Sequence, residues 1–288
     1  MVIDNNLFDA IYKRCSIRKY KLEPLASSIL KEVEEYTHII PKLSDIDMKI
    51  HIVEDGKKIQ DISKGIIGSY GKIKAPHYLV VTSEEKPGYM ENVGYSLEHL
   101  VLKLTTLNLG TCWIGGFIKK ELLTNVIEMP NNHVAVIVIS FGYPLHYEDA
   151  TPKKLEDNLI DTIGFNPNRE TDIPSKLASS AKRKALSEII DCNLTEDWLE
   201  IMNAVRHAPS AINSQPWRFF KKDNIIHMYR IKRGKIAKNL DHINKIDSGI
   251  ALCHLMVAGI LKGKKLTLEY LDNMERKNLV YFISIIEN

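Results

Sequence analysis

Residues 14–18, which read RCSIR, bring together side chains that could bind an anion. Arg14, Ser16 and Arg18 recur at every second position, and an extended backbone points such side chains to one side. Two guanidinium groups and a hydroxyl suit a phosphate, because arginine offers planar bidentate donors that keep their charge. The stretch predicts a phosphate site, but such a triplet is also typical of a solvated surface strand or a helix start.

A second stretch with functional character lies far downstream, at residues 208–219. It reads APSAINSQPWRF and combines two prolines with Ser, Asn and Gln side chains, directly after a helix-like run. A third stretch, GTCWIGGF at residues 110–117, contains a pair of adjacent glycines. Paired glycines let a ligand approach the backbone closely, although a plain turn between helix and strand would look the same.

Composition sets the limits on class and function. The chain has 288 residues, 44% of them hydrophobic, and its 39 basic and 36 acidic residues are interleaved to a net charge of +3. It is therefore long and apolar enough for one large or two ordinary domains, and no basic arm predicts nucleic-acid binding. We expect no membrane span, because no signal peptide is evident and no apolar run reaches about 18 residues.

Cysteines and histidines give little support for a metal site or for a protein nucleophile. The four cysteines are far apart and form no CxxC pair, so thiols in a reducing cytoplasm are the default expectation. No Ser-His-Asp arrangement or HExxH motif can be assembled by spacing from the ten histidines. We expect Cys112 to be a packing residue, and His99 and His254 to be core histidines.

Apolar periodicity predicts one order of elements twice. In the first half we expect a helix after Pro24, strands at 48–55 and 75–84, a buried helix at 91–109 closed by Gly110, and a strand at 134–144. In the second half we expect helical structure over 175–205, strands at 216–224 and 225–231, a buried helix at 247–262 closed by Gly263, and a strand at 279–286.

Two local matches indicate an ancient duplication. Pro41 pairs with Pro209 at a shift of 209 − 41 = 168, and His99 pairs with His254 at a shift of 254 − 99 = 155. The alternative is two α+β domains that share only an element order. We predict a first half at 1–150, a linker at 151–175 and a second half at 176–288.

The motifs RCSIRKY, LNLGTCWIGGF, FGYP with TPKK, and APSAINSQPWRF together resemble the nitroreductase family of FMN-dependent oxidoreductases. The last matches the family segment at every defined position, but it stands in the second half, whereas RxSxR stands in the first. The resemblance implies an α+β fold with helix-flanked, mainly antiparallel sheets, in which two degenerate repeats form an internal pseudo-dimer around a central pair of helices. It also implies one FMN at the interface of the two halves.

The resemblance further implies which residues bind the cofactor. Lys153 and Lys154 would close over the phosphate. Gly115 and Gly116 would let a backbone N–H reach the flavin N5, and Ser69, Tyr70 and Lys72 would contact the pyrimidine edge. Around the ring, Pro209 would pack, Ser210 and Asn213 would hydrogen-bond, and Gln215 with Pro216 would fix the turn. We expect Trp217 and Phe219 to anchor the core, and no protein side chain to act as the catalyst, since the flavin carries the electron chemistry.

The implied function is the reduction of FMN by NADH or NADPH, followed by ping-pong transfer to a nitroaromatic or quinone-like acceptor. We expect a cytoplasmic monomer whose partner is a small-molecule acceptor. Two alternatives stay open at this point: an FMN store or sensor without turnover, and a structural two-domain protein without a cofactor. A flavin spectrum distinguishes them.

Overall fold

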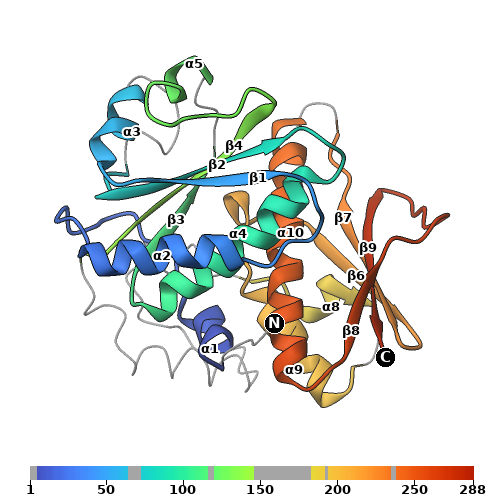
Figure 1. Ribbon diagram of the computed structural model, residues 1–288. Helices are drawn as coiled ribbons and strands as arrows, with labels where there is room; N and C mark the ends of the chain where they lie inside the picture. Colours follow the sequence, from blue (N-terminus) through green and yellow to red (C-terminus); the bar gives the residue numbers. More distant parts are fainter. Residues whose placement is uncertain (1–4, 64–72, 116–119, 146–182, 192–193, 235–237) are drawn as a thin grey trace. The chain divides into compact units, whose positions relative to one another are not determined.

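The computed structural model describes residues 5–63, 73–115, 120–145, 183–191, 194–234 and 238–288 (Figure 1). It divides the chain into two compact units, one made of Met1–Tyr12 and Pro152–Asn288 and the other of Lys13–Thr151. Each unit is described by itself below. Ser69, Tyr70, Lys72, Gly116, Lys153, Lys154 and the predicted linker at 151–175 lie outside the described residues.

The unit Lys13–Thr151 is built on a four-stranded antiparallel sheet in the order β1-β2-β4-β3. Its strands are β1 (Met48–Val53), β2 (His77–Glu84), β3 (Gly110–Ile114) and β4 (His133–Gly142). The central strand β2 is buried along nearly its whole length, which explains its continuous apolar run, whereas the edge strand β1 mixes buried and exposed positions.

Helices cover both faces of this sheet (Figure 1). On one face lie α2 (Ser27–Ile39) and α4 (Tyr89–Thr106), and on the other lie α3 (Gly56–Ile62) and α5 (Lys120–Leu123). A hydrophobic core joins the sheet to α3 and α5 and includes Tyr78, Val80, Cys112 and Leu123. The expected packing role of Cys112 is thus confirmed.

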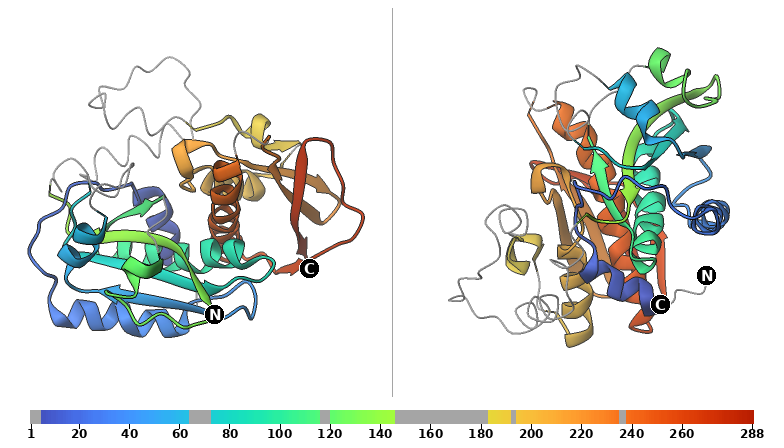
Figure 2. Two further views of the ribbon diagram at one scale, coloured as in Figure 1. Left: turned by 90° about the horizontal axis from the view of Figure 1, so that it is seen from above. Right: turned by 90° about the vertical axis from the view of Figure 1, so that its left-hand side faces the viewer.

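The other unit carries a five-stranded sheet in the order β5-β6-β7-β9-β8. Its strands are β5 (Ile190–Asp191), β6 (Trp217–Lys222), β7 (Ile225–Ile231), β8 (Leu266–Glu269) and β9 (Leu279–Glu287). Only β5 is parallel to its neighbour. The helices are α1 (Asn5–Lys13), of which residues 5–12 belong here, α8 (Leu186–Ile189), α9 (Glu196–Arg206) and α10 (Lys238–Leu261). Figure 2 shows α10 lying along one face of this sheet.

The two sheets confirm the predicted duplication. The order β1-β2-β4-β3 of one unit is repeated as β6-β7-β9-β8 in the other, and α4 and α10 occupy the same place in their repeats. The second copy is shorter because α3 separates β1 from β2, whereas β6 and β7 are joined by residues 223 and 224 alone. The fold is therefore the predicted α+β arrangement of mainly antiparallel, helix-flanked sheets.

Three predicted elements differ from the observed ones. The helix at 91–109 ends at Thr106, and Asn108, with φ 60°, reverses the chain. Gly110 therefore does not close the helix but begins β3, so most of the predicted glycine loop is a strand. The helical prediction over 175–205 is confirmed at its end, where α9 lies, but it is wrong in the described residues before α9, because the short strand β5 separates α8 from α9.

The helix α10 is longer than its apolar pattern indicated, since it begins at Lys238. Within the described residues, one stretch of it, Leu240–Leu261, is long and apolar enough to cross a membrane, and 83% of its most apolar window is buried. The expectation that no apolar stretch reaches this length is therefore wrong. The burial is that of a helix in a protein core.

Candidate functional site

The RCSIR stretch runs beside β3. Ser16 forms an isolated parallel bridge with Thr111, and the amide of Ile17 donates to the Thr111 carbonyl at 2.9 Å. Gly110 makes this approach possible, because a Cβ at that position would lie 2.6 Å from Cγ1 of Ile17. The strand β3 thus fixes the backbone that carries Arg14, Ser16 and Arg18.

The three predicted phosphate ligands differ in burial. The Arg14 side chain is 4% exposed, and its Nε lies 3.9 Å from Oε1 of the buried Glu98 in α4. Ser16 is partly buried, while Arg18 is exposed and its Nη1 lies 3.5 Å from the Ser16 carbonyl. Arg14 therefore forms an ion pair with a buried carboxylate, whereas Arg18 is exposed.

The charges of both guanidinium groups influence the pKa of one neighbouring thiol, that of Cys112. Burial raises the pKa of Cys112, and the charges of Arg18 and Arg14 act in the opposite direction. The positive field of the two arginines therefore reaches the middle of β3.

Two buried polar atoms, one in this segment and one in β3, lack a hydrogen-bond partner. Among the described residues, neither Nε of Arg14 nor Oγ1 of Thr111 has a hydrogen-bond partner. Buried polar groups are nearly always satisfied, so an unsatisfied buried donor is available to a water, an ion or a ligand. A guanidinium N–H, a hydroxyl and a nearby second arginine fit an anionic group such as the phosphate of FMN.

The APSAINSQP segment is a compact turn between α9 and β6. Pro209 is buried, and Oγ of Ser210 accepts the Gln215 amide at 2.9 Å. Gln215 is 2% exposed, and its Oε1 accepts the Lys184 amide at 2.8 Å while its Nε2 lies 3.2 Å from Oδ1 of Asn213. The structure thus gives Gln215 the turn-fixing contacts expected of it.

Arg183 ties this turn down from a segment that the sequence analysis left without a role. Its Nη1 donates to the Ala208 carbonyl at 2.9 Å and to Oδ1 of Asn213 at 3.2 Å, and its Nη2 donates to the His207 carbonyl at 3.1 Å. Oδ1 of Asn213 is therefore engaged within the turn.

The backbone of this turn is strained. Ile212, Asn213 and Gln215 have φ values of 49°, 55° and 45°, in the left-handed region that non-glycine residues rarely adopt. Ile212 is the most unfavourable of the three because it is β-branched, and it is 84% exposed. Strain of this kind persists only where surrounding contacts enforce it, and it is found preferentially at ligand-binding sites.

One of the enforcing contacts comes from α10. The Ala211 amide donates to the Asp247 carboxylate, which is 3% exposed. Burial raises the pKa of Asp247 to about 7, against the opposing effects of the Asn244 and Ala211 hydrogen bonds and the Arg233 charge. A carboxyl group that changes charge near neutral pH therefore lies directly behind the turn.

Of the two glycines predicted to face the flavin N5, only Gly115 is described; it is exposed and follows β3 directly. Trp217 and Phe219 are fully buried, as expected of core anchors. The predicted ligands Pro209, Ser210, Asn213 and Gln215 thus lie within one turn, and Arg14, Ser16 and Arg18 lie along β3. Glu98, Thr111, Arg183, Asn244 and Asp247 were not found from the sequence, because no local motif marks them.

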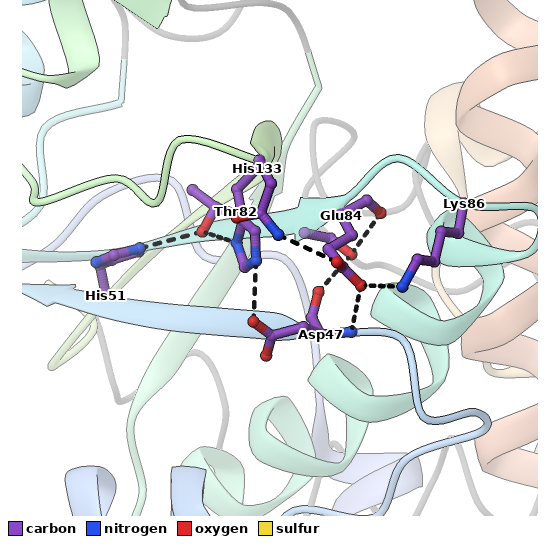
Figure 3. A network of polar contacts seen from close by, with 8 residues as sticks. Asp47, His51, Thr82, Glu84, Lys86 and His133 are labelled. Carbon is purple, nitrogen blue, oxygen red and sulfur yellow. Dashed lines mark hydrogen bonds and ion pairs between the residues drawn. The ribbon is translucent and has the colours of Figure 1, made fainter.

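A second polar network lies where β1, β2 and β4 meet (Figure 3). His133 contacts Asp47 through Nε2 at 3.1 Å and Thr82 Oγ1 through Nδ1 at 3.0 Å, and Thr82 Oγ1 also lies 3.2 Å from Nε2 of His51. Spacing alone gave no hydroxyl–His–carboxylate arrangement, yet the fold assembles one. Thr82 is fully buried, so no substrate reaches its hydroxyl, and the network joins strands instead.

Comparison with known proteins identifies relatives. The family profile described as "Putative TM nitroreductase" matches residues 6–259. A protein of Archaeoglobus fulgidus named "Putative NADH dehydrogenase/NAD(P)H nitroreductase" is 22% identical over 150 residues, which are 48% of this chain and 86% of that protein.

Two solved structures are also similar. The crystal structure of a "putative nitroreductase" from Thermotoga maritima has a TM-score of 0.57 and 18% identity, and covers 99% of this chain and 95% of its own. The crystal structure of a nitroreductase with bound FMN from Bacteroides fragilis has a TM-score of 0.43 and 19% identity, and covers 50% of this chain and 90% of its own. The Thermotoga maritima structure supports the same fold over nearly the whole chain.

Proposed function

We propose that this chain, which belongs to the family described as "Putative TM nitroreductase", is an FMN-dependent NAD(P)H oxidoreductase. It binds one FMN, drawing phosphate ligands from the first half and ring ligands from the second. NADH or NADPH delivers the electrons, and a nitroaromatic or quinone-like compound accepts them in a ping-pong sequence. The A. fulgidus relative is named for NAD(P)H, which supports this class of donor.

The observation that carries the proposal is the pair of unpartnered buried atoms beside β3. Arg14 Nε and Thr111 Oγ1 lack hydrogen-bond partners among the described residues, although Arg14 Nε forms a long ion pair with Glu98. Ser16 and the exposed Arg18 lie on the same short segment as Arg14. A dianionic phosphate would satisfy these donors through charge-assisted hydrogen bonds. It would also balance the positive charge of Arg18, whereas Glu98 balances that of Arg14.

Ring recognition is assigned to the strained turn. FMN, when bound, supplies the hydride chemistry, so the turn needs only to position the ring. Pro209 offers an apolar surface, and Ser210 and Asn213 offer polar side chains. Gln215 holds these residues in register through its own buried contacts. The exposed Gly115 offers a backbone N–H without a Cβ in the way.

The proposal also covers features for which the sequence is the only support. Lys153, Lys154, Ser69, Tyr70, Lys72 and Gly116 are kept as predicted FMN contacts. We propose that the chain works as a cytoplasmic monomer, because the duplicated fold supplies within one chain the two copies that a dimer would provide.

A spectrum with a titration tests the function directly. The purified protein should show flavin absorption near 450 nm, and the amount of flavin released on denaturation should be about one per chain. Under anaerobic conditions NADH or NADPH should bleach this band, and a quinone should restore it. If the band were bleached but not restored, or if neither nucleotide reduced the bound flavin, the result would favour the alternative of a flavin store without turnover. Protein that stays colourless with excess FMN would exclude flavin binding altogether.

A further inference from the structure

Two side chains of α10 contact the strained turn on either side of its left-handed residues. The Ala211 amide donates to Oδ1 and Oδ2 of Asp247 at 3.1 and 3.3 Å. On the other side, Nδ2 of Asn244 donates to Oγ of Ser214 at 3.1 Å. Ile212 and Asn213 lie between these two attachment points. The helix therefore fixes both ends of the part of the turn that carries positive φ values.

The two α10 side chains are themselves held firmly. Asn244 is fully buried, and its Nδ2 donates to Oδ2 of Asp247 at 2.7 Å while its Oδ1 accepts from Nε of Arg233 at 3.2 Å. Asp247 must accept from two donors, the Ala211 amide and Asn244. A carboxylate meets this need because both of its oxygens accept, whereas a carboxamide would turn an NH2 group towards the NH2 of Asn244.

The first repeat contains a simpler form of the same contact. Asn92 of α4 accepts the amides of Leu43 and Ser44 at 2.9 and 3.1 Å. Asp247 and Asn92 are separated by 247 − 92 = 155 positions, the shift that relates His254 to His99. Leu43 and Ala211 each lie two residues after the matched prolines Pro41 and Pro209. The two acceptors are therefore equivalent.

The two repeats differ in the backbone conformation of the loop that this contact stabilises. The loop after Pro41 contains no positive φ value at residues 42–47, whereas the turn after Pro209 contains three. Counting back 155 positions from Asn244 gives Tyr89, so the first repeat has no amide in place of Asn244. The additional attachment point thus occurs in the repeat that has the strained backbone.

We propose that Asn244 and Asp247 are positioning residues that hold Ser210–Gln215 in its left-handed conformation for flavin binding. Hydrogen bonds from α10 on both sides of the left-handed residues offset the cost of a left-handed conformation at non-glycine positions. Without the two contacts the turn would relax and move Ser210 and Asn213. The proposal rests on the proposed function for its ligand but not for its conformational part.

The conformational part is tested without flavin. In the cofactor-free protein, hydrogen exchange of the Ala211 amide should become at least about tenfold faster in Asn244→Ala and in Asp247→Leu, which corresponds to losing roughly 1.4 kcal/mol. Asn244→Ala keeps the carboxylate and is the safer variant for folding. Circular dichroism and thermal melts show that each variant is folded. Exchange at the wild-type rate in both folded variants would overturn the proposal.

Rescue at Ile212 separates positioning from general stability. Asn244→Ala should weaken FMN and riboflavin equally, by about tenfold, because the turn is assigned to the ring. Adding Ile212→Gly should restore most of this affinity, since glycine adopts positive φ without strain. Ile212→Ala is the matched control and should not restore it, because its Cβ remains. Equal rescue by glycine and alanine, or by neither, would contradict the proposal.

The equivalent residue of the first repeat provides a further control. Asn92→Ala removes the same kind of contact from a loop without positive φ values, so it should leave flavin affinity within about twofold. If Asn92→Ala weakened flavin as much as Asn244→Ala does, the effect would be one of overall stability and the positioning role would be rejected. If wild-type protein bound no flavin, the proposed function would fail, and the exchange experiment would still decide on the conformational role.

Discussion

At the scale of single residues, the two arginines of RCSIR have different environments. Arg14 is buried beside Glu98, which neutralises part of its charge, whereas Arg18 is exposed and has no carboxylate partner among the described ion pairs. A phosphate at the proposed site would therefore gain more from Arg18 than from Arg14. Removing Arg14 would also take the cationic partner away from the buried Glu98, so Arg18 is the better position to test.

We predict that Arg18→Ala weakens FMN by about ten- to a hundredfold, because it removes charge-assisted hydrogen bonds worth roughly 1.5–3 kcal/mol. Riboflavin, which lacks the phosphate, should bind wild type and variant almost equally. Asn213→Ala should weaken both ligands alike. Fluorescence titration of the two ligands on the two variants forms a complete cycle. Equal loss of both ligands in Arg18→Ala would mean that the arginine supports the fold.

At the scale of elements, β3 controls the RCSIR backbone. Ser16 bridges Thr111, and Gly110 leaves room for the side chain of Ile17. The strand therefore acts as a template for the predicted phosphate segment. The contact between β3 and this segment depends on the absence of a Cβ at position 110.

We predict that Gly110→Ala destabilises the protein by roughly 1–3 kcal/mol, as overpacking does, because the new Cβ would lie 2.8 Å from Cβ of Ile17. FMN affinity should fall more than riboflavin affinity, since the displaced segment carries Ser16 and Arg18. Gly234→Ala is the matched control, because its Cβ would meet no atom within 4 Å. Denaturant unfolding and ligand titration measure both effects. A variant as stable as the control would show that Ile17 repacks freely.

At the scale of the whole molecule, each unit contains a titratable group whose pKa is shifted by burial, and the shifted pKa values of the two groups change stability with pH in opposite directions. Burial, with the charges of Lys49 and His133, lowers the pKa of His51 to about 4, although Glu128 opposes this. In the other unit, burial raises the pKa of Asp247 to about 7, and the charge of Arg233 opposes this rise. One helical turn away from Asn244, Asp241 forms an ion pair with Arg230. These two groups, His51 and Asp247, therefore contribute to the pH dependence of stability with opposite signs.

The sign of each contribution follows from proton linkage. His51 binds its proton less readily when folded, so its contribution is complete above about pH 6.5 and is lost as the pH falls towards 4. Asp247 binds its proton more readily when folded, so its contribution is complete below about pH 3.8 and is lost as the pH rises towards 7.

We predict that His51→Gln reduces the loss of unfolding free energy between pH 7 and pH 5, by about 1 kcal/mol after allowance for the partial exposure of His51. The glutamine amide can still donate to Thr82. The exposed His38→Gln controls for the loss of an imidazole. Urea unfolding at the two pH values measures the difference. An unchanged pH dependence in His51→Gln would mean that the folded protein does not disfavour the charged imidazole.

Local patterns in the sequence predicted much of this protein. Alternation gave the strands around Ile50 and Met228, apolar runs gave the buried strands and helices, and the matched pairs Pro41 with Pro209 and His99 with His254 gave the duplication. These features are readable because periodicity and turn chemistry act over a few residues. The segment APSAINSQPWRF was likewise recognisable, because its defining residues are contiguous.

Tertiary structure alone decided the contacts that hold the predicted site. Gly110 looked like the end of a helix, but its role is set by Ile17, which lies 93 positions earlier (110 − 17). The left-handed conformation of Ile212 contradicts the preference of a β-branched residue, and it is enforced by Asp247 and Asn244, which lie more than 30 positions later. Local propensity cannot predict such contacts, because they form only when the fold brings distant segments of the chain together.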